Sequence, residues 1–180
     1  GLFEPAHGGR LMVFVVQRSM NADRALGLLK VLQDSGRLLG GLTSADRVAV
    51  VSFDSHLSVW LDFSADFELV ERILADKVLF SDPDSVAPGP GPSLFPALDE
   101  EVSRRTYRVE EALELLGEAL APLPGAKSVV LVGYGFGEFT VTLGIPGSRV
   151  AQRYERALAV LADARAAVFS LDATAVDYHT

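Results

Sequence analysis

The stretch that decides the fold is Leu11-Met12-Val13-Phe14-Val15-Val16, a short apolar run rich in β-branched and aromatic side chains. Such a run is typical of a strand that is buried on both faces of a parallel sheet. Apolar residues at helical spacing follow it at positions 25, 28, 29 and 32, and the glycines at 36, 40 and 41 are expected to end this helix. A second buried run, residues 48–53, comes next. The chain therefore begins with a strand, a helix and another strand.

A tight hairpin then interrupts the alternation of strands and helices. Leu57, Val59 and Leu61 alternate with Ser58 and Trp60 only a few residues after the second strand. Too little chain separates the two strands for a parallel crossover. We therefore expect an antiparallel hairpin that turns through residues 54–56.

The rest of the chain returns to alternating elements. We expect a helix over residues 67–74, capped by Ser64 or Asp66, and an irregular loop rich in proline and glycine over residues 82–92. Pro96 is expected in the first turn of another helix, whose apolar stripe ends at Leu120. The remaining apolar patterns predict strands at 129–132, 139–145 and 167–171 and a helix at 150–161.

This order predicts one α/β domain over residues 1–180. Its architecture is a doubly wound, Rossmann-like sheet that is mostly parallel, with one antiparallel edge strand and helices on both faces.

Composition excludes several classes of function. The formal net charge is −8 and no basic patch appears, so the chain's field repels nucleic acid. The longest uninterrupted apolar run has six residues, against roughly 18 for a membrane-spanning helix. The chain has no cysteine and therefore no thiol nucleophile, disulfide or Cys-ligated zinc.

The order and spacing of four segments resemble a von Willebrand factor type A domain, in particular its bacterial VWFA-related subgroup. The segments are residues 17–21, 46–53, 119–132 and 168–173. The resemblance implies the fold derived above, a protein-binding role and a location outside the cytoplasm. It also implies a Mg²⁺ site at the carboxyl ends of the central strands, where the family's first loop reads Asp-x-Ser-x-Ser.

This sequence departs from that metal-binding pattern in all three loops. The first motif becomes Gln17-x-Ser19-x-Asn21, the second loop offers Ser93 or the neighbouring proline where a Thr is usual, and Tyr134 replaces the aspartate of the third. Mg²⁺ usually requires one or two carboxylates beside neutral oxygens. The candidate set here is uncharged, so we expect no metal cofactor. Asp23 or Glu138 would have to restore a Mg²⁺ site.

Aromatic residues replace the metal as candidate contacts. The loops at the carboxyl ends of the strands build the binding crevice of an open α/β sheet. They carry Phe95, Tyr134, Phe136 and Phe139, which act as anchors for a partner or fold inward to fill the space of a metal.

Catalysis has little support in the sequence. Asp54-Ser55-His56 has the residue types of a catalytic triad, but a triad needs groups that converge from separated positions. We interpret the three as a polar turn whose side chains point apart, and expect no enzyme unless turnover depends on His56.

The sequence therefore predicts a non-enzymatic, adhesion-type protein-interaction module with a degraded metal site and a protein partner. Two alternatives stay open. One is Mg²⁺-dependent adhesion through an unconventional acid, and the other is a structural scaffold whose hairpin edge, residues 57–61, pairs with a neighbouring chain.

Overall fold

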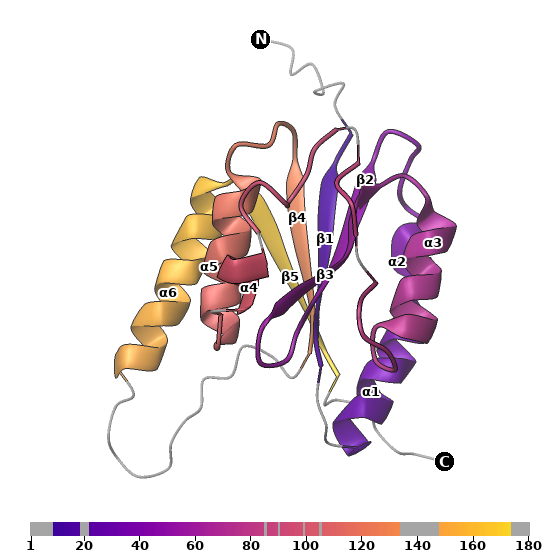
Figure 1. Cartoon of the computed structure of the whole chain (residues 1–180), viewed down its shortest axis with the longest axis horizontal. Helices are drawn as coiled ribbons and strands as arrows, with labels where there is room; N and C mark the ends of the chain where they lie inside the picture. Colours follow the sequence, from indigo (N-terminus) through magenta and orange to yellow (C-terminus); the bar gives the residue numbers. More distant parts are fainter. Residues whose placement is uncertain are drawn as a thin grey trace.

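The computed structural model of the chain describes residues 9–18, 22–84, 86–89, 91–98, 100–104, 106–133 and 148–173. Within these residues a five-stranded sheet has the order β3-β2-β1-β4-β5 (Figure 1). The strands are Leu11–Gln17 (β1), Arg47–Phe53 (β2), Leu57–Ser64 (β3), Lys127–Gly133 (β4) and Ala166–Asp172 (β5). The helices are Ala22–Gln33 (α1), Ser35–Leu39 (α2), Phe67–Arg72 (α3), the π-helical turn Ile73–Lys77 (η1), Glu100–Arg104 (α4), Val109–Leu120 (α5) and Ser148–Asp163 (α6).

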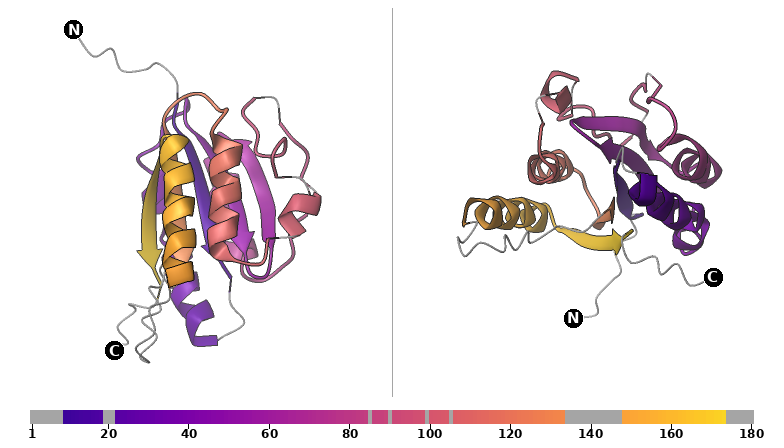
Figure 2. Two further views of the ribbon diagram at one scale, coloured as in Figure 1. Left: turned by 90° about the vertical axis from the view of Figure 1, so that its left-hand side faces the viewer. Right: turned by 90° about the horizontal axis from the view of Figure 1, so that it is seen from below.

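The sheet is doubly wound around β1. Strands β2, β1, β4 and β5 are parallel, and β3 pairs with β2 in the antiparallel sense. Helices α1, α2 and α3 cover one face, and α5 and α6 cover the other (Figures 1 and 2). This confirms the predicted Rossmann-like α/β fold with one antiparallel edge strand.

Alternation along β1 divides the core into two layers. Val13 and Val15 face the cluster that includes α5 and α6, whereas Phe14 and Val16 face the cluster that includes α1 and η1. All four side chains are fully buried. The central position of β1 explains why its sequence is continuously apolar.

Helix boundaries differ from expectation in two places. The first helix stops at Gln33, and a separate short helix, α2, includes Gly36 instead of ending there. Pro96 lies in a turn and not in the first turn of a helix. The next helix, α4, begins four residues later. The predicted cap at Asp66 is confirmed, since its carboxylate accepts a hydrogen bond from the Leu69 amide at 3.0 Å. The predicted strand 139–145 lies outside the described residues.

The β3 edge of the sheet is irregular. The β2–β3 register shifts twice, between Val48 and Val50 and between Val50 and Val51. The buried Asp62 of β3 accepts a hydrogen bond from the Leu94 amide at 3.0 Å, which holds a later segment against this strand. Register shifts and covering segments oppose the addition of a further strand. The Asp62 contact lies beyond residues 57–61, so the scaffold alternative, in which those residues pair with a neighbouring chain, stays a prediction.

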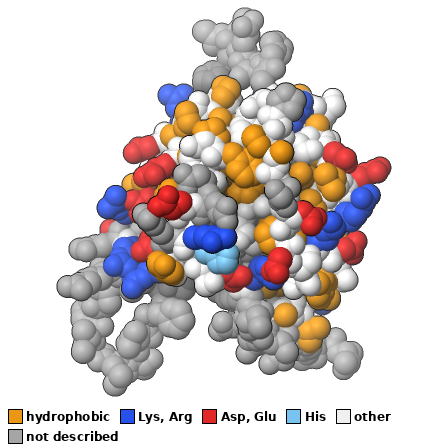
Figure 3. Space-filling model, viewed as in Figure 1, with side chains coloured by type: hydrophobic (Ala, Val, Ile, Leu, Met, Phe, Trp, Pro, Cys, Tyr) orange, Lys and Arg blue, Asp and Glu red, His pale blue; other side chains and the backbone are white. Residues whose placement is uncertain are grey.

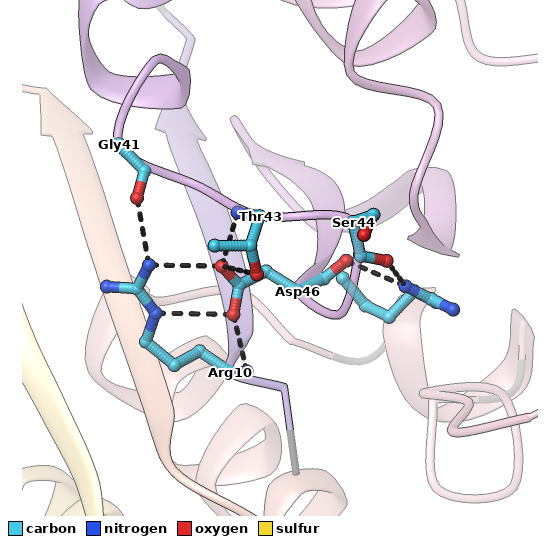
Figure 4. A network of polar contacts seen from close by, with 6 residues as sticks. Arg10, Gly41, Thr43, Ser44 and Asp46 are labelled. Atoms are coloured by element: carbon cyan, nitrogen blue, oxygen red, sulfur yellow. Dashed lines mark hydrogen bonds and ion pairs between the residues drawn. The ribbon is translucent and has the colours of Figure 1, made fainter. Parts of the chain in front are cut away.

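A network of polar contacts closes the amino end of the sheet (Figure 4). The Asp46 Oδ1 atom accepts hydrogen bonds from the Arg10 backbone amide at 2.7 Å and from Arg10 Nε at 3.3 Å. Its Oδ2 atom accepts from Arg10 Nη2 at 3.0 Å, the Thr43 amide at 2.7 Å and Thr43 Oγ1 at 3.1 Å. This network, the Arg10–Asp46 clasp, ties the start of β1 to the loop before β2.

Two further contacts fasten helices to the sheet and its flanks. Gly27 of α1 lies so close to the end of β5 that an added Cβ would be 2.3 Å from the Ala173 carbonyl oxygen. The buried Lys127 Nζ donates to the Ala164 carbonyl at 3.0 Å, at the end of α6. Burial, together with the nearby charge of Arg165, lowers the pKa of Lys127.

Among the described residues, every helix is too short or too polar to cross a bilayer.

Candidate binding edge

The carboxyl ends of β1 and β4 form the switch point of the sheet. The next helices after β1 and β4, α1 and α6, cover opposite faces of the sheet. In open α/β sheets, ligands bind outside this point. The candidate binding edge therefore begins at Gln17 and Gly133, the last residues of the two strands.

Gln17 packs directly on Gly133. A Cβ at position 133 would lie 2.6 Å from Gln17 Oε1 and 2.8 Å from Gln17 Cβ. Only glycine leaves room for this side chain, because a methyl group would overlap both atoms. The amide of Gln17 thus lies over the end of β4, at the centre of the binding edge.

Arg18 continues the binding edge toward the hairpin. Its backbone amide donates to the Phe53 carbonyl at 2.8 Å, which extends the contact between β1 and β2. Its guanidinium carbon lies 5.8 Å from the ring centroid of Trp60 and one terminal nitrogen lies 4.0 Å from Asp54 Oδ2. A guanidinium at this distance from an indole ring is attracted to it.

Trp60 is itself held in place. Its indole nitrogen donates to the Ser52 hydroxyl at 2.8 Å in a buried hydrogen bond between β3 and β2. The residue is only 6% exposed and belongs to the core cluster that includes α1 and η1. The contact with Arg18 adds a second role, because Trp60 attracts a charged group at the binding edge.

The Asp54-Ser55-His56 turn is polar, as expected, but its side chains do not point apart. Ser55 Oγ lies 3.2 Å from both Asp54 Oδ1 and His56 Nδ1, and Asp54 Oδ1 lies 3.4 Å from the same Nδ1. In a triad the acid and the hydroxyl bind opposite nitrogens of the ring, so this arrangement is not a triad. Burial raises the pKa of Asp54, but hydrogen bonds from the Ser55 and His56 amides outweigh it, and the pKa lies below its ordinary value.

The structure separates the predicted site residues. Gln17 lies at the switch point, whereas Ser93 and Phe95 flank Leu94, whose amide is bound to Asp62 on the edge strand β3. Leu61 pairs with Val50, so this anchor is level with the middle of β2 and not with its carboxyl end. The expectation that Ser93 and Phe95 share one rim with Gln17 is therefore not met. The Ser93 hydroxyl instead accepts from the Phe95 amide at 3.2 Å.

The remaining predicted positions lie outside the described residues: Ser19, Asn21, Tyr134, Phe136, Phe139 and Glu138. Asp23 falls within α1. In the part of the chain that the structure describes, no group of three or more His, Asp or Glu side chains is placed to hold a metal ion.

Sequence reasoning missed Arg18, because it occupies a variable position of the motif Gln17-x-Ser19-x-Asn21. One signal was available. A charged residue directly after a buried strand lies at the carboxyl edge of the sheet, and a tryptophan on the adjoining hairpin is long enough to support it.

Comparisons with known proteins agree with the fold. No protein family and no curated protein matches the chain. An aerotolerance-related membrane protein from Bacteroides fragilis NCTC 9343 is similar, with a TM-score of 0.51 and 17% identity over 92% of this chain and 67% of that one. BatB from Bacteroides thetaiotaomicron has a TM-score of 0.45 and 15% identity, over 90% of each chain. The PilB minor pilin from Streptococcus sanguinis has a TM-score of 0.44 and 15% identity, over 93% of this chain and 59% of that one.

These likenesses are informative about architecture alone. The Bacteroides fragilis structure has the α/β arrangement found here. The class defined by the fold and the binding edge is a doubly wound α/β domain.

Proposed function

We propose that this chain is a non-enzymatic protein-interaction module of the von Willebrand factor A type. It binds a protein partner through the loops at the carboxyl ends of its parallel strands and uses no metal. The resemblance that implies this role also implies a location outside the cytoplasm, which is part of the proposal.

The observation that carries the proposal is the chemistry of the switch point. A neutral amide, Gln17, lies against Gly133, and the next residue carries a guanidinium. Mg²⁺ depends on carboxylates to offset its charge. A fixed cation beside the candidate site raises the electrostatic cost of a divalent ion further. The binding edge is therefore better suited to direct contacts with a partner than to contacts through a metal.

The metal-free part of the proposal predicts a calorimetric result. Titration with MgCl₂ or MnCl₂ at neutral pH is expected to give no binding in the micromolar range, because Gln17 and Tyr134 stand where the family's metal site has its aspartates. Micromolar binding that Ser19→Ala abolishes would overturn the proposal in favour of Mg²⁺-dependent adhesion through an unconventional acid.

The protein-binding part predicts that peptides can be selected from a displayed library with the chelator EDTA present. The double change Phe136→Ser and Phe139→Ser is expected to weaken the selected peptides at least about tenfold, as for loss of an aromatic anchor. Leu38→Ser is the matched control, since Leu38 is exposed on α2, which leads to the amino end of β2. Selection that fails, or peptides that lose affinity equally in the control, would contradict a binding role for these loops.

A further inference from the structure

We propose that the Arg18 guanidinium is the anchor for a carboxylate of the protein partner. This inference rests on the proposed function and names the chemistry of the group that the binding edge receives. The Arg18 side chain has N–H donors that form no hydrogen bond with the described residues.

A guanidinium has five N–H donors in a planar fork. Within the described residues, the polar contact of the Arg18 side chain is with Asp54 Oδ2, and at 4.0 Å this exceeds hydrogen-bond distance. Its other contact places the guanidinium carbon 5.8 Å from the centroid of the Trp60 ring, which uses no hydrogen-bond acceptor and leaves N–H donors for a partner. The side chain is 21% exposed, so its charge is largely desolvated but remains accessible.

The neighbours of Arg18 restrict the positions that its guanidinium can take. The backbone of the residue is bound to Phe53, and the Trp60 ring beneath it is bound to Ser52. A side chain ordered before binding loses less rotamer entropy when a partner arrives. Asp54 attracts the guanidinium without a hydrogen bond to it, because its Oδ2 atom is 4.0 Å away and its Oδ1 atom accepts from Ser55 and His56.

The surroundings favour a carboxylate over a phosphate or a nucleic acid. The chain carries a net charge of −8, and Asp54 lies beside the anchor. A polyanion would be repelled by this field, whereas a singly charged carboxylate fits the fork of one guanidinium in bidentate geometry. An Asp or Glu side chain of a protein is the corresponding ligand.

Nitrogen-15 NMR of the whole chain tests this assignment with a defined probe. N-acetyl-aspartate N-methylamide is titrated while the Nε–Hε resonance of Arg18 is followed, and the neutral asparagine analogue serves as the control ligand. We expect a saturable shift in the millimolar range for the aspartate probe and none for its analogue. Arg18→Gln should reduce the affinity, followed at the Asp54 amide, at least about tenfold, as expected for a charged hydrogen bond. Arg37→Gln, which removes an exposed arginine of α2, should leave it unchanged.

Equal shifts with both probes, or a response that survives Arg18→Gln, would overturn the carboxylate anchor. If Arg18→Gln fails to fold, the comparison of the two probes on the unaltered chain still decides the question. Displayed peptides separate the two proposals. Selected peptides that lack acidic residues and tolerate Arg18→Gln defeat the anchor and leave the interaction module intact, whereas a failure to select any peptide defeats the module itself.

Discussion

Asp46→Asn is expected to lower the free energy of unfolding by about 1 to 3 kcal/mol, the range for leaving a buried donor without an acceptor. The substitution keeps the shape of the side chain but places an NH₂ group where Oδ2 accepts from Arg10 and Thr43. Urea unfolding followed by the fluorescence of the single tryptophan, Trp60, measures the change. Asp84→Asn is the control, because Asp84 is 88% exposed and its pair with Lys77 is worth little in water.

The Arg10–Asp46 clasp also predicts how stability depends on pH. Hydrogen bonds from the Arg10 side chain, and then from the Thr43 and Arg10 amides, hold the pKa of Asp46 well below its ordinary value against the effect of burial. In the unfolded chain the pKa of an aspartate such as Asp46 is about 3.9. Its contribution is therefore complete above that pH and declines below it. The difference in unfolding free energy between the wild type and Asp46→Asn should shrink by about 1 kcal/mol between about pH 5 and about pH 3. A difference that is constant over this range, or equal losses for Asp46→Asn and Asp84→Asn, would contradict the clasp.

Gly27→Ala is expected to destabilise the chain by about 1 to 3 kcal/mol, the usual cost of overpacking. The new methyl group would lie 2.3 Å from the Ala173 carbonyl oxygen, and a backbone carbonyl cannot turn aside as a flexible side chain can. The higher helix propensity of alanine, about 1 kcal/mol, offsets part of this cost. The measurement is again urea unfolding.

Gly89→Ala is the matched control for this glycine, because a Cβ at position 89 meets nothing within 4 Å. It should change the unfolding free energy by less than about 0.5 kcal/mol. A neutral or stabilising Gly27→Ala would show that α1 does not approach the end of β5 as closely as described.

The sequence pattern predicted the sheet well because its signal is local. The run from Leu11 to Val16 is apolar at every position, and this follows from burial on both faces of the central strand. The short spacing between residues 53 and 57 allowed only a hairpin. The ends of helices were harder to predict from the sequence. Gly36 was expected to end a helix, but it lies within α2, where it packs near Glu71 of α3. Tertiary packing outweighs intrinsic propensity at such positions.

The candidate binding edge was less predictable, since it depends on contacts between distant residues. The packing of Gln17 on Gly133 joins positions 116 residues apart, which no local pattern reveals. Ser93 was assigned to the same rim because the family resemblance places the second metal-binding loop at this position. The register shifts of β3 and the Asp62 anchor place that loop elsewhere. Arg18 had a local signal, but its role depends on Trp60, which the register of the hairpin brings beneath it.

The buried Lys127 bears on how this molecule can be handled chemically. The chain has three lysines, and the ammonium of this one is enclosed and bound to the Ala164 carbonyl. Amine-directed coupling of the native chain at lysine is therefore confined to Lys30 and Lys77, which lie on α1 and η1. Both helices belong to the same layer, so a molecule tethered through its lysines is held by that layer and leaves the opposite layer, α5 and α6, free of attachment.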